Sequence, residues 1–139
     1  MKVKITVKQM GKKRNKIDEA DFALRRQPQS VKELIEESVH TCVSLYNQRW
    51  DKKDAAMPLS DSEIEDMSEI GKIAFGINYG SKKAEEDLAV QTAIQAYEDG
   101  LVRIFLNQEE LGDIGQEITV SEGDCLLFIK MTMLSGAMF

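Results

Sequence analysis

The only histidine, His40, lies close in sequence to two residues that could serve as nucleophiles, Cys42 and Ser44. Nucleophilic catalysis requires a base within hydrogen-bond reach of the nucleophile and a third group that orients the base. On a helix, His40 and Cys42 point in different directions because residues two positions apart do not share a face. Ser44 does share a face with His40, but no third group or oxyanion hole accompanies the pair. We therefore expect His40 to face solvent and predict no enzymatic activity.

Motifs for metals, disulfides and phosphates are also incomplete. Cys42 and Cys125 lie in apolar segments of different elements, without a neighbouring cysteine or histidine cluster, and are predicted to be reduced and buried. Gly71, Gly76 and Gly80 do not match the spacing of a phosphate-binding loop, which requires a Lys and a Ser or Thr after its last glycine. The sequence therefore predicts neither a metal nor a cofactor.

The chain of 139 residues has the length and composition of one globular domain. Apolar residues make up 42% and charged residues 30% of the sequence, a balance typical of a protein with one hydrophobic core. No apolar run is long enough to cross a bilayer, and the alternating start of the chain does not resemble a secretory signal. We expect a single domain over residues 1–139, located in the cytoplasm and not in a membrane.

Charge is distributed unevenly along the chain. Residues 1–16 contain seven lysines and arginines and no acid, which leaves 11 basic and 24 acidic residues, a charge of -13, in the remainder. Lys12, Lys13, Arg14 and Lys16 could contact an anion or a nucleic acid, but the acidic remainder would repel a phosphate backbone beyond this patch. Solvated lysines on the exposed face of a hairpin are the favoured interpretation.

The first part of the chain has the pattern of a β-hairpin. Val3, Ile5 and Val7 alternate with polar residues, which predicts a strand with one buried face. The polar segment 11–15 interrupts this pattern, and extended structure returns before Pro28. Residues 2–24 are therefore predicted to form two antiparallel strands.

A helix should follow from Ser30 to about Arg49. Ser30 and Glu33 form a capping box, in which a hydroxyl and a carboxylate satisfy backbone N–H groups of the first turn. The 3.6-residue period places one apolar stripe against the sheet. Val31, Leu34, Ile35, Cys42, Leu45 and Tyr46 form this stripe, whereas Glu33, Glu37, His40 and Ser44 lie outside it.

A helical insertion is expected at about residues 51–100. Its polar start, 51–58, predicts a loop, and the capping pattern around Ser60 predicts a helix over roughly 61–75. A second helix is predicted from Ser81 to Gly100, which is suited to end a helix. Its apolar stripe consists of Val90, Ala93, Ile94 and Tyr97.

The last third of the chain returns to extended structure. Strands are predicted at 101–106, 118–120 and 125–133, with turns at 107–108 and 122–124. The final segment is apolar at both of its alternating sets of positions, which indicates burial on both faces. It is therefore predicted to be a central strand, with the N-terminal strand as its neighbour.

This order of elements resembles the ubiquitin-like β-grasp superfamily: a hairpin, a crossing helix and a last strand placed centrally and parallel to the first. Residues 102–108 and 120–129 are similar to the sulfur carriers of thiamine and molybdopterin synthesis. The resemblance implies an α+β fold with a mixed sheet, and a carrier role through a terminal Gly-Gly. Here Ala137 follows Gly136 and two bulky residues end the chain, so the Gly-Gly pair is missing.

We expect a non-enzymatic adaptor domain that binds another protein through its sheet edge or its apolar C-terminal tail. Methionine-rich surfaces adapt to irregular partners, and an exposed apolar terminus is suited to contact. The tail could instead fold back onto the domain or contact a second copy in a homodimer. A carrier acting through its C-terminus and a nucleic-acid contact through the basic hairpin are the alternatives. The predicted partner-binding residues are Met131, Met133, Leu134, Gly136, Met138 and Phe139.

Overall fold

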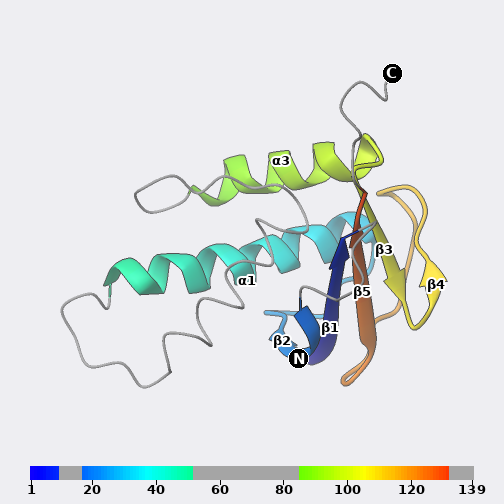
Figure 1. Cartoon of the computed structure of the whole chain (residues 1–139), viewed down its shortest axis with the longest axis horizontal. Helices are drawn as coiled ribbons and strands as arrows, with labels where there is room; N and C mark the ends of the chain where they lie inside the picture. The colour runs from blue at the N-terminus through cyan, green and yellow to red at the C-terminus, as the bar shows by residue number, and fades with distance from the viewer. Residues whose placement is uncertain (10–16, 52–84, 132–139) are drawn as a thin grey trace.

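The chain folds as an α+β domain in the computed structural model, which describes residues 1–9, 17–51 and 85–131. Two helices and a five-stranded sheet make up this described part (Figure 1). In chain order the elements are β1 (Lys2–Gln9), β2 (Ile17–Ala23), α1 (Val31–Asp51), α3 (Glu86–Glu98), β3 (Val102–Leu106), β4 (Glu109–Glu110) and β5 (Cys125–Lys130).

The sheet is mixed, with the strand order β2-β1-β5-β3-β4. β1 and β5 run parallel, in a register that places Ile5 opposite Leu126 and Val7 opposite Phe128. All other neighbouring strands are antiparallel. The predictions of an N-terminal hairpin, and of a central last strand parallel to the first, are therefore confirmed.

The start of α1 is fixed by its cap and by a distant loop. The Glu33 backbone N–H donates to Ser30 Oγ at 3.2 Å, and the Glu33 carboxylate accepts from the backbone N–H of Gln29 at 3.1 Å. The next donors are used as well, because the N–H groups of Val31 and Lys32 donate to carbonyl oxygens in the segment 114–116. Ser30 thus starts the helix as predicted, and no N–H of the first turn remains open for an anion.

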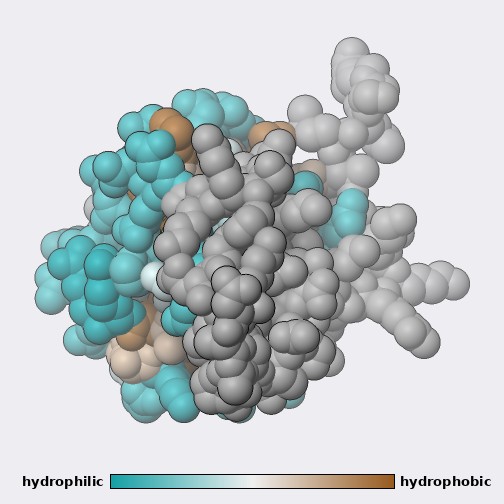
Figure 2. Space-filling view, turned by 90° about the vertical axis from the view of Figure 1, so that its left-hand side faces the viewer, coloured by the Kyte–Doolittle hydropathy of each residue, from teal (hydrophilic) through white to brown (hydrophobic). Residues whose placement is uncertain are grey.

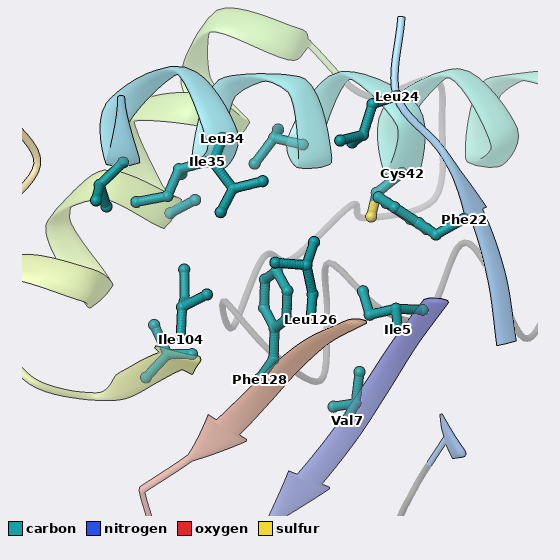
Figure 3. Close-up of a cluster of buried hydrophobic side chains, with 14 of the residues drawn as sticks. Ile5, Val7, Phe22, Leu24, Leu34, Ile35, Cys42, Ile104, Leu126 and Phe128 are labelled. Carbon is teal, nitrogen blue, oxygen red and sulfur yellow. The ribbon is translucent and has the colours of Figure 1, made fainter. Parts of the chain in front are cut away.

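The core lies between one face of the sheet and the two helices. Figure 3 shows Leu34, Ile35 and Cys42 of α1 pointing towards Leu126 and Phe128 of β5, and all five side chains are buried. α3 lies beside α1 (Figure 1) and adds its small residues to the same core. The core also includes Val3, Ile5, Val7, Phe22, Leu24, Val31, Val39, Val43, Ala89, Ala93, Ala96, Val102, Ile104, Leu111 and Val120.

α3 ends as predicted but is rotated relative to its predicted stripe. Gly100 has a φ of +78°, and its N–H donates to the Tyr97 carbonyl while that of Leu101 donates to the Ala96 carbonyl. This is a Schellman motif, in which glycine supplies the left-handed residue. Ala89, Ala93 and Ala96 are the buried residues of the helix, whereas most of the predicted stripe is only partly buried. Small residues permit this burial because they let two helices approach closely.

The predicted strand at 118–120 is wrong. Residues 118–120 form no strand: a single bridge, between Ser30 and Glu117, precedes them, and the Ile118 N–H donates to the Gln29 carbonyl at 3.1 Å. The short strand is instead β4, which follows β3 through a turn at Asn107 and Gln108 with positive φ at both residues. Residues 111–121 are used to cover the start of α1, and this role has no periodic signature.

Cys125 also differs from its prediction. Cys42 is buried as expected, but Cys125 is exposed at the start of β5. Successive residues of a strand point to opposite faces, so Cys125 lies on the face away from Leu126. On that second face Leu127 and Ile129 are only partly buried in the described part of the chain, so the predicted burial of both faces is met in part.

Several predicted features lie outside the described residues. They are the polar loop, the helix at 61–75, the capping of a helix by Ser81, and the chain beyond Met131. The division into a single domain with an insertion is thus not tested over 52–84. Neither described helix combines the length and the apolar character that crossing a membrane requires.

Truncation of the central strand should cost far more than truncation of an exposed leucine. Phe128 is fully buried, and we expect Phe128→Ala to lower the free energy of unfolding by about 3 to 5 kcal/mol through loss of burial and formation of a cavity. Leu88 is 57% exposed, so Leu88→Ala should change the free energy of unfolding by less than about 0.5 kcal/mol. Denaturant unfolding measures both, and equal effects would contradict this description of the core.

Candidate functional site

Glu37 is the only charged side chain that is fully buried among the described residues. It lies in the second turn of α1, on the side of the helix facing the segment that follows β2. Burial of an ionised carboxylate is costly unless it is paired and hydrogen-bonded. Glu37 and its partners therefore form a candidate functional site.

Two consecutive arginines hold the Glu37 carboxylate. Arg25 donates from Nε to Oε1 at 3.2 Å and from Nη2 to Oε2 at 2.8 Å, which is a bidentate pair. Arg26 donates from Nε to Oε2 at 3.1 Å. The arginine side chains remain 51% and 60% exposed, so one buried anion holds two cations that also face solvent.

The segment between β2 and α1 brings these arginines to the helix. Leu24 is buried, and its N–H donates to the Met1 carbonyl at 2.8 Å. Gln27 Nε2 donates to the Val120 carbonyl at 2.6 Å, which ties the same segment to the loop before β5. With both ends anchored, Arg25 and Arg26 lie across Glu37.

The pKa of Glu37 reflects a balance between burial and its two cationic neighbours. Burial raises the pKa, but the hydrogen bonds and the charge of Arg25, together with Arg26, outweigh it and hold the pKa below its usual value. The same contact with Glu37 raises the pKa of Arg25. The cluster therefore stays ionised at neutral pH, with one negative and two positive charges.

A hollow of about 450 Å³ opens beside this cluster, between the arginines, α1 and the start of α3. We call it the arginine hollow. Arg25, Arg26 and Lys32 supply its cations, whereas Glu86 and Asp87 at the first turn of α3 supply acids on another wall. It is also lined by Glu36, Val90, Gln91 and Ile94.

His40 joins α1 to α3 beside the arginine hollow. Its Nδ1 lies 2.7 Å from Glu86 Oε1, and its side chain is 27% exposed. The prediction that His40 faces solvent is therefore wrong, because α3 covers the part of α1 from which His40 projects. The pair fixes Glu86, one of the acids of the hollow.

A second hollow, of about 470 Å³, lies where α3 ends against β3 and the loop after β4. The Tyr97 hydroxyl lies within hydrogen-bond distance of the Leu111 and Gly112 carbonyl oxygens, which holds this loop on the helix. Burial, reinforced by the nearby Glu110 and Asp113, raises the pKa of Tyr97. Arg103, the one arginine that lines this second hollow, pairs with Glu110 at 3.5 Å. Acids outnumber it in the lining.

Ser38, next to Glu37, has an unusual environment. It is fully buried, and its hydroxyl oxygen has no hydrogen-bond partner among the described residues. A buried hydroxyl without a partner costs free energy that an apolar side chain of similar size would not. Within the described residues, the Ser38 hydroxyl therefore adds no hydrogen bond that would offset its burial.

The residues predicted to bind a partner are not brought together in the described part. Met131 is partly buried, and its N–H donates to the Leu101 carbonyl at 2.9 Å. The other predicted tail residues, Met133, Leu134, Gly136, Met138 and Phe139, lie outside the described residues. The same holds for the basic residues Lys12, Lys13, Arg14 and Lys16, between β1 and β2.

The arginine cluster was missed by sequence reasoning, and its Glu37 was assigned to the polar face of α1. Helical periodicity identifies the side of a helix that faces the sheet, but it does not reveal a loop that covers another side. The available signal was the pair Arg25 and Arg26 just before a capped helix with a glutamate in its second turn. This spacing allows a guanidinium to reach back to the helix.

No family model matches the chain, and no curated protein or solved structure is significantly similar to it. Within the ranges that the structure describes, no group of three or more His, Cys, Asp or Glu side chains is placed to hold a metal ion. Function must therefore be argued from the contacts and charges of the chain itself.

Replacement of Glu37 should remove an acid-sensitive part of the stability. We expect Glu37→Gln to lower the free energy of unfolding at neutral pH by roughly 2 kcal/mol, since charge-assisted hydrogen bonds from two arginines are lost. Because folding lowers the pKa of Glu37, its contribution is complete above the usual glutamate value of 4.5 and is lost as pH falls through the lower folded-state pKa. The difference between wild type and variant should thus narrow below pH 4.5.

Urea unfolding from neutral to acidic pH measures this difference. The neighbouring Glu36 forms no ion pair in the described part of the structure, so Glu36→Gln is the matched control and should change stability little. A constant difference at all pH values would show that the Glu37 carboxylate is not held as described.

Two hydroxyls of α1 should respond in opposite ways to removal. Ser38→Ala should leave the free energy of unfolding unchanged or raise it by up to about 1 kcal/mol, because an unpaired buried oxygen is removed. The Thr41 hydroxyl lies within hydrogen-bond distance of the Ala23 and Glu37 carbonyl oxygens and donates its one proton there, so Thr41→Val should lower the free energy of unfolding by about 1 kcal/mol. Thermal or denaturant unfolding distinguishes them, and a large loss in Ser38→Ala would reveal a hydrogen bond absent from this description.

Proposed function

We propose that this chain is a non-enzymatic, cytoplasmic adaptor of the ubiquitin-like β-grasp type, which binds another protein. The parallel pairing of β1 with the central β5, and a helix packed across one face of the sheet, support the β-grasp assignment. Fold alone does not define a function, so the binding role rests on a site. That site is the arginine hollow.

The observation that carries the proposal is a buried Glu37 used to hold two half-exposed arginines. A buried ion pair contributes little net stability, and apolar residues of similar volume commonly do as well or better. Its use here is explained if Arg25 and Arg26 must be presented together at the surface. Arginine is enriched at protein interfaces and among the residues that dominate binding energy.

The described surface offers few alternatives for an apolar contact. Leu88 is the only large hydrophobic side chain that is exposed among the described residues. Figure 2 shows that the described residues on one face are mostly hydrophilic, with small and separate hydrophobic areas. Recognition by fixed charges therefore fits this part of the chain better than recognition by an apolar patch.

The sheet edges are poorly suited to the addition of a partner strand. β2 is irregular where it pairs with β1 between Ile5 and Val7, and Glu19 adopts a positive φ there. β4 has only two residues, Glu109 and Glu110. Bulges, short length and charge at an edge oppose strand addition, so we place the partner at the helical side and at the predicted tail contact.

Capture from the native host tests the adaptor role. A tagged full-length chain should retain a specific protein after crosslinking, and the purified pair should re-form a complex of defined stoichiometry by light scattering. Arg103→Gln removes a surface arginine outside the arginine hollow, at the second hollow. This variant should retain the same protein as the wild type does. Failure of any purified protein to re-form a complex would reject the proposal.

Two other results would assign a different role. Intact mass measurement of the chain from cells would favour a carrier if it found a chain shortened to Gly136 or a terminal thiocarboxylate. Binding to DNA or RNA that weakens steeply with salt would favour a nucleic-acid contact through Lys12, Lys13, Arg14 and Lys16.

A further inference from the structure

The unused donors of the arginine pair indicate what the arginine hollow recognises. Glu37 engages Nε and Nη2 of Arg25 but only Nε of Arg26. In the described part of the chain, Nη1 of Arg25 and both Nη atoms of Arg26 have no hydrogen-bond partner. Arg25 and Arg26 both line the hollow, and their guanidinium groups lie close together because they share one carboxylate oxygen of Glu37.

This arrangement is prepared for an anion before any anion binds. Two adjacent guanidinium groups repel each other, and the buried Glu37 between them offsets that repulsion. An arginine already held by a carboxylate loses less side-chain freedom on binding, which favours affinity. Guanidinium donors match the geometry of carboxylate and phosphate oxygens.

The charges on the other wall favour a carboxylate over a phosphate. Glu86 and Asp87 line the same hollow, with Glu36 beside Lys32. A doubly charged phosphate would be repelled by these acids more strongly than a singly charged carboxylate. The same acids can accept hydrogen bonds from backbone N–H groups or basic side chains of a bound segment. The hollow thus complements a peptide better than a small anion.

We infer that the arginine hollow binds a segment of the partner protein that places one side-chain carboxylate against Arg25 and Arg26. This inference deepens the proposed adaptor function and rests on it. In the complex, Arg26 supplies the larger number of free donors, while Arg25 remains mainly engaged with Glu37. Arg26 is therefore the residue whose loss affects binding most without disturbing the bidentate pair.

NMR titration of the arginine side chains tests the inference with defined probes. We would observe the Nε–Hε resonances while adding a capped tetrapeptide with a single Glu among uncharged residues, acetate, inorganic phosphate, or sodium chloride at matched ionic strength. The peptide should produce saturable shifts for Arg25 and Arg26, and sodium chloride should not. Absence of saturable shifts with the peptide would overturn the inference.

Variants separate a specific site from general electrostatic attraction. Arg26→Gln should weaken the peptide about tenfold, as expected for loss of a charge-assisted contact, while the bidentate Arg25 pair maintains the fold. Arg103→Gln removes an arginine that is 52% exposed and ion-paired, and it should bind the peptide as wild type does. If both variants weakened peptide binding equally, the loss would reflect only the change in net charge, and the inference would be overturned.

The other probes distinguish the sources of the anion. If acetate bound as tightly as the peptide, the hollow would be a site for a small carboxylate and not for a protein segment. Tighter binding of phosphate would assign it to phosphoryl groups, and either result would overturn the inference.

Failure of this inference can be told apart from failure of the adaptor proposal. If the Arg26→Gln chain retained its protein partner with unchanged affinity, the hollow would not be the contact while the adaptor role would stand. If neither the wild type nor the variant formed a complex, the adaptor role itself would fail.

Discussion

The parallel pairing of β1 with β5 is the constraint on which the rest of the described structure depends. It joins the first strand to one more than 100 residues later, so the intervening chain must fold around it. Closing so long a loop is costly in conformational entropy, and the return comes from burial of Ile5, Val7, Leu126 and Phe128 on one face of the sheet. Since β5 also pairs with β3, this central strand connects the N-terminal hairpin to the C-terminal part.

That pairing also brings the loop before β5 to the start of α1, which this loop covers. The chain must cross from the edge strand β2 to the opposite side of the sheet, and the segment around Arg25 makes the first part of this crossing. The loop before β5 returns to the same place, where its carbonyl oxygens accept from Val31 and Lys32 and from the Gln27 side chain. Two irregular segments thus meet at the start of one helix, and the arginine hollow lies beside their junction.

Local patterns in the sequence predicted those elements whose partners are also local or whose faces differ in polarity. The alternation of Val3, Ile5 and Val7 defined β1, and Ser30 marked the start of α1 because a cap acts within one turn. The apolar character of β5 predicted its central position with β1 as its neighbour. By contrast, the helical pattern predicts that His40 faces solvent and places Glu37 only outside the apolar stripe, because this pattern distinguishes the face towards the sheet from all others. The segment 24–30 covers Glu37, and α3 covers His40. These contacts are made by distant parts of the chain, so only the tertiary structure reveals them.

The burial of Glu37 depends on residues from another segment, so the sequence of α1 alone does not predict it. On a solvent-exposed helix, a glutamate at this position would change the free energy of unfolding little. Because Glu37 is buried, its charge depends on both arginines for compensation. Its carboxylate has two oxygens, and three N–H groups share them, so most acceptor capacity is used while several donors are left over. A carboxylate that only stabilised the loop could be satisfied by one bidentate arginine. The second arginine adds a repulsive charge and free donors, and the proposed contact with a partner carboxylate would use both.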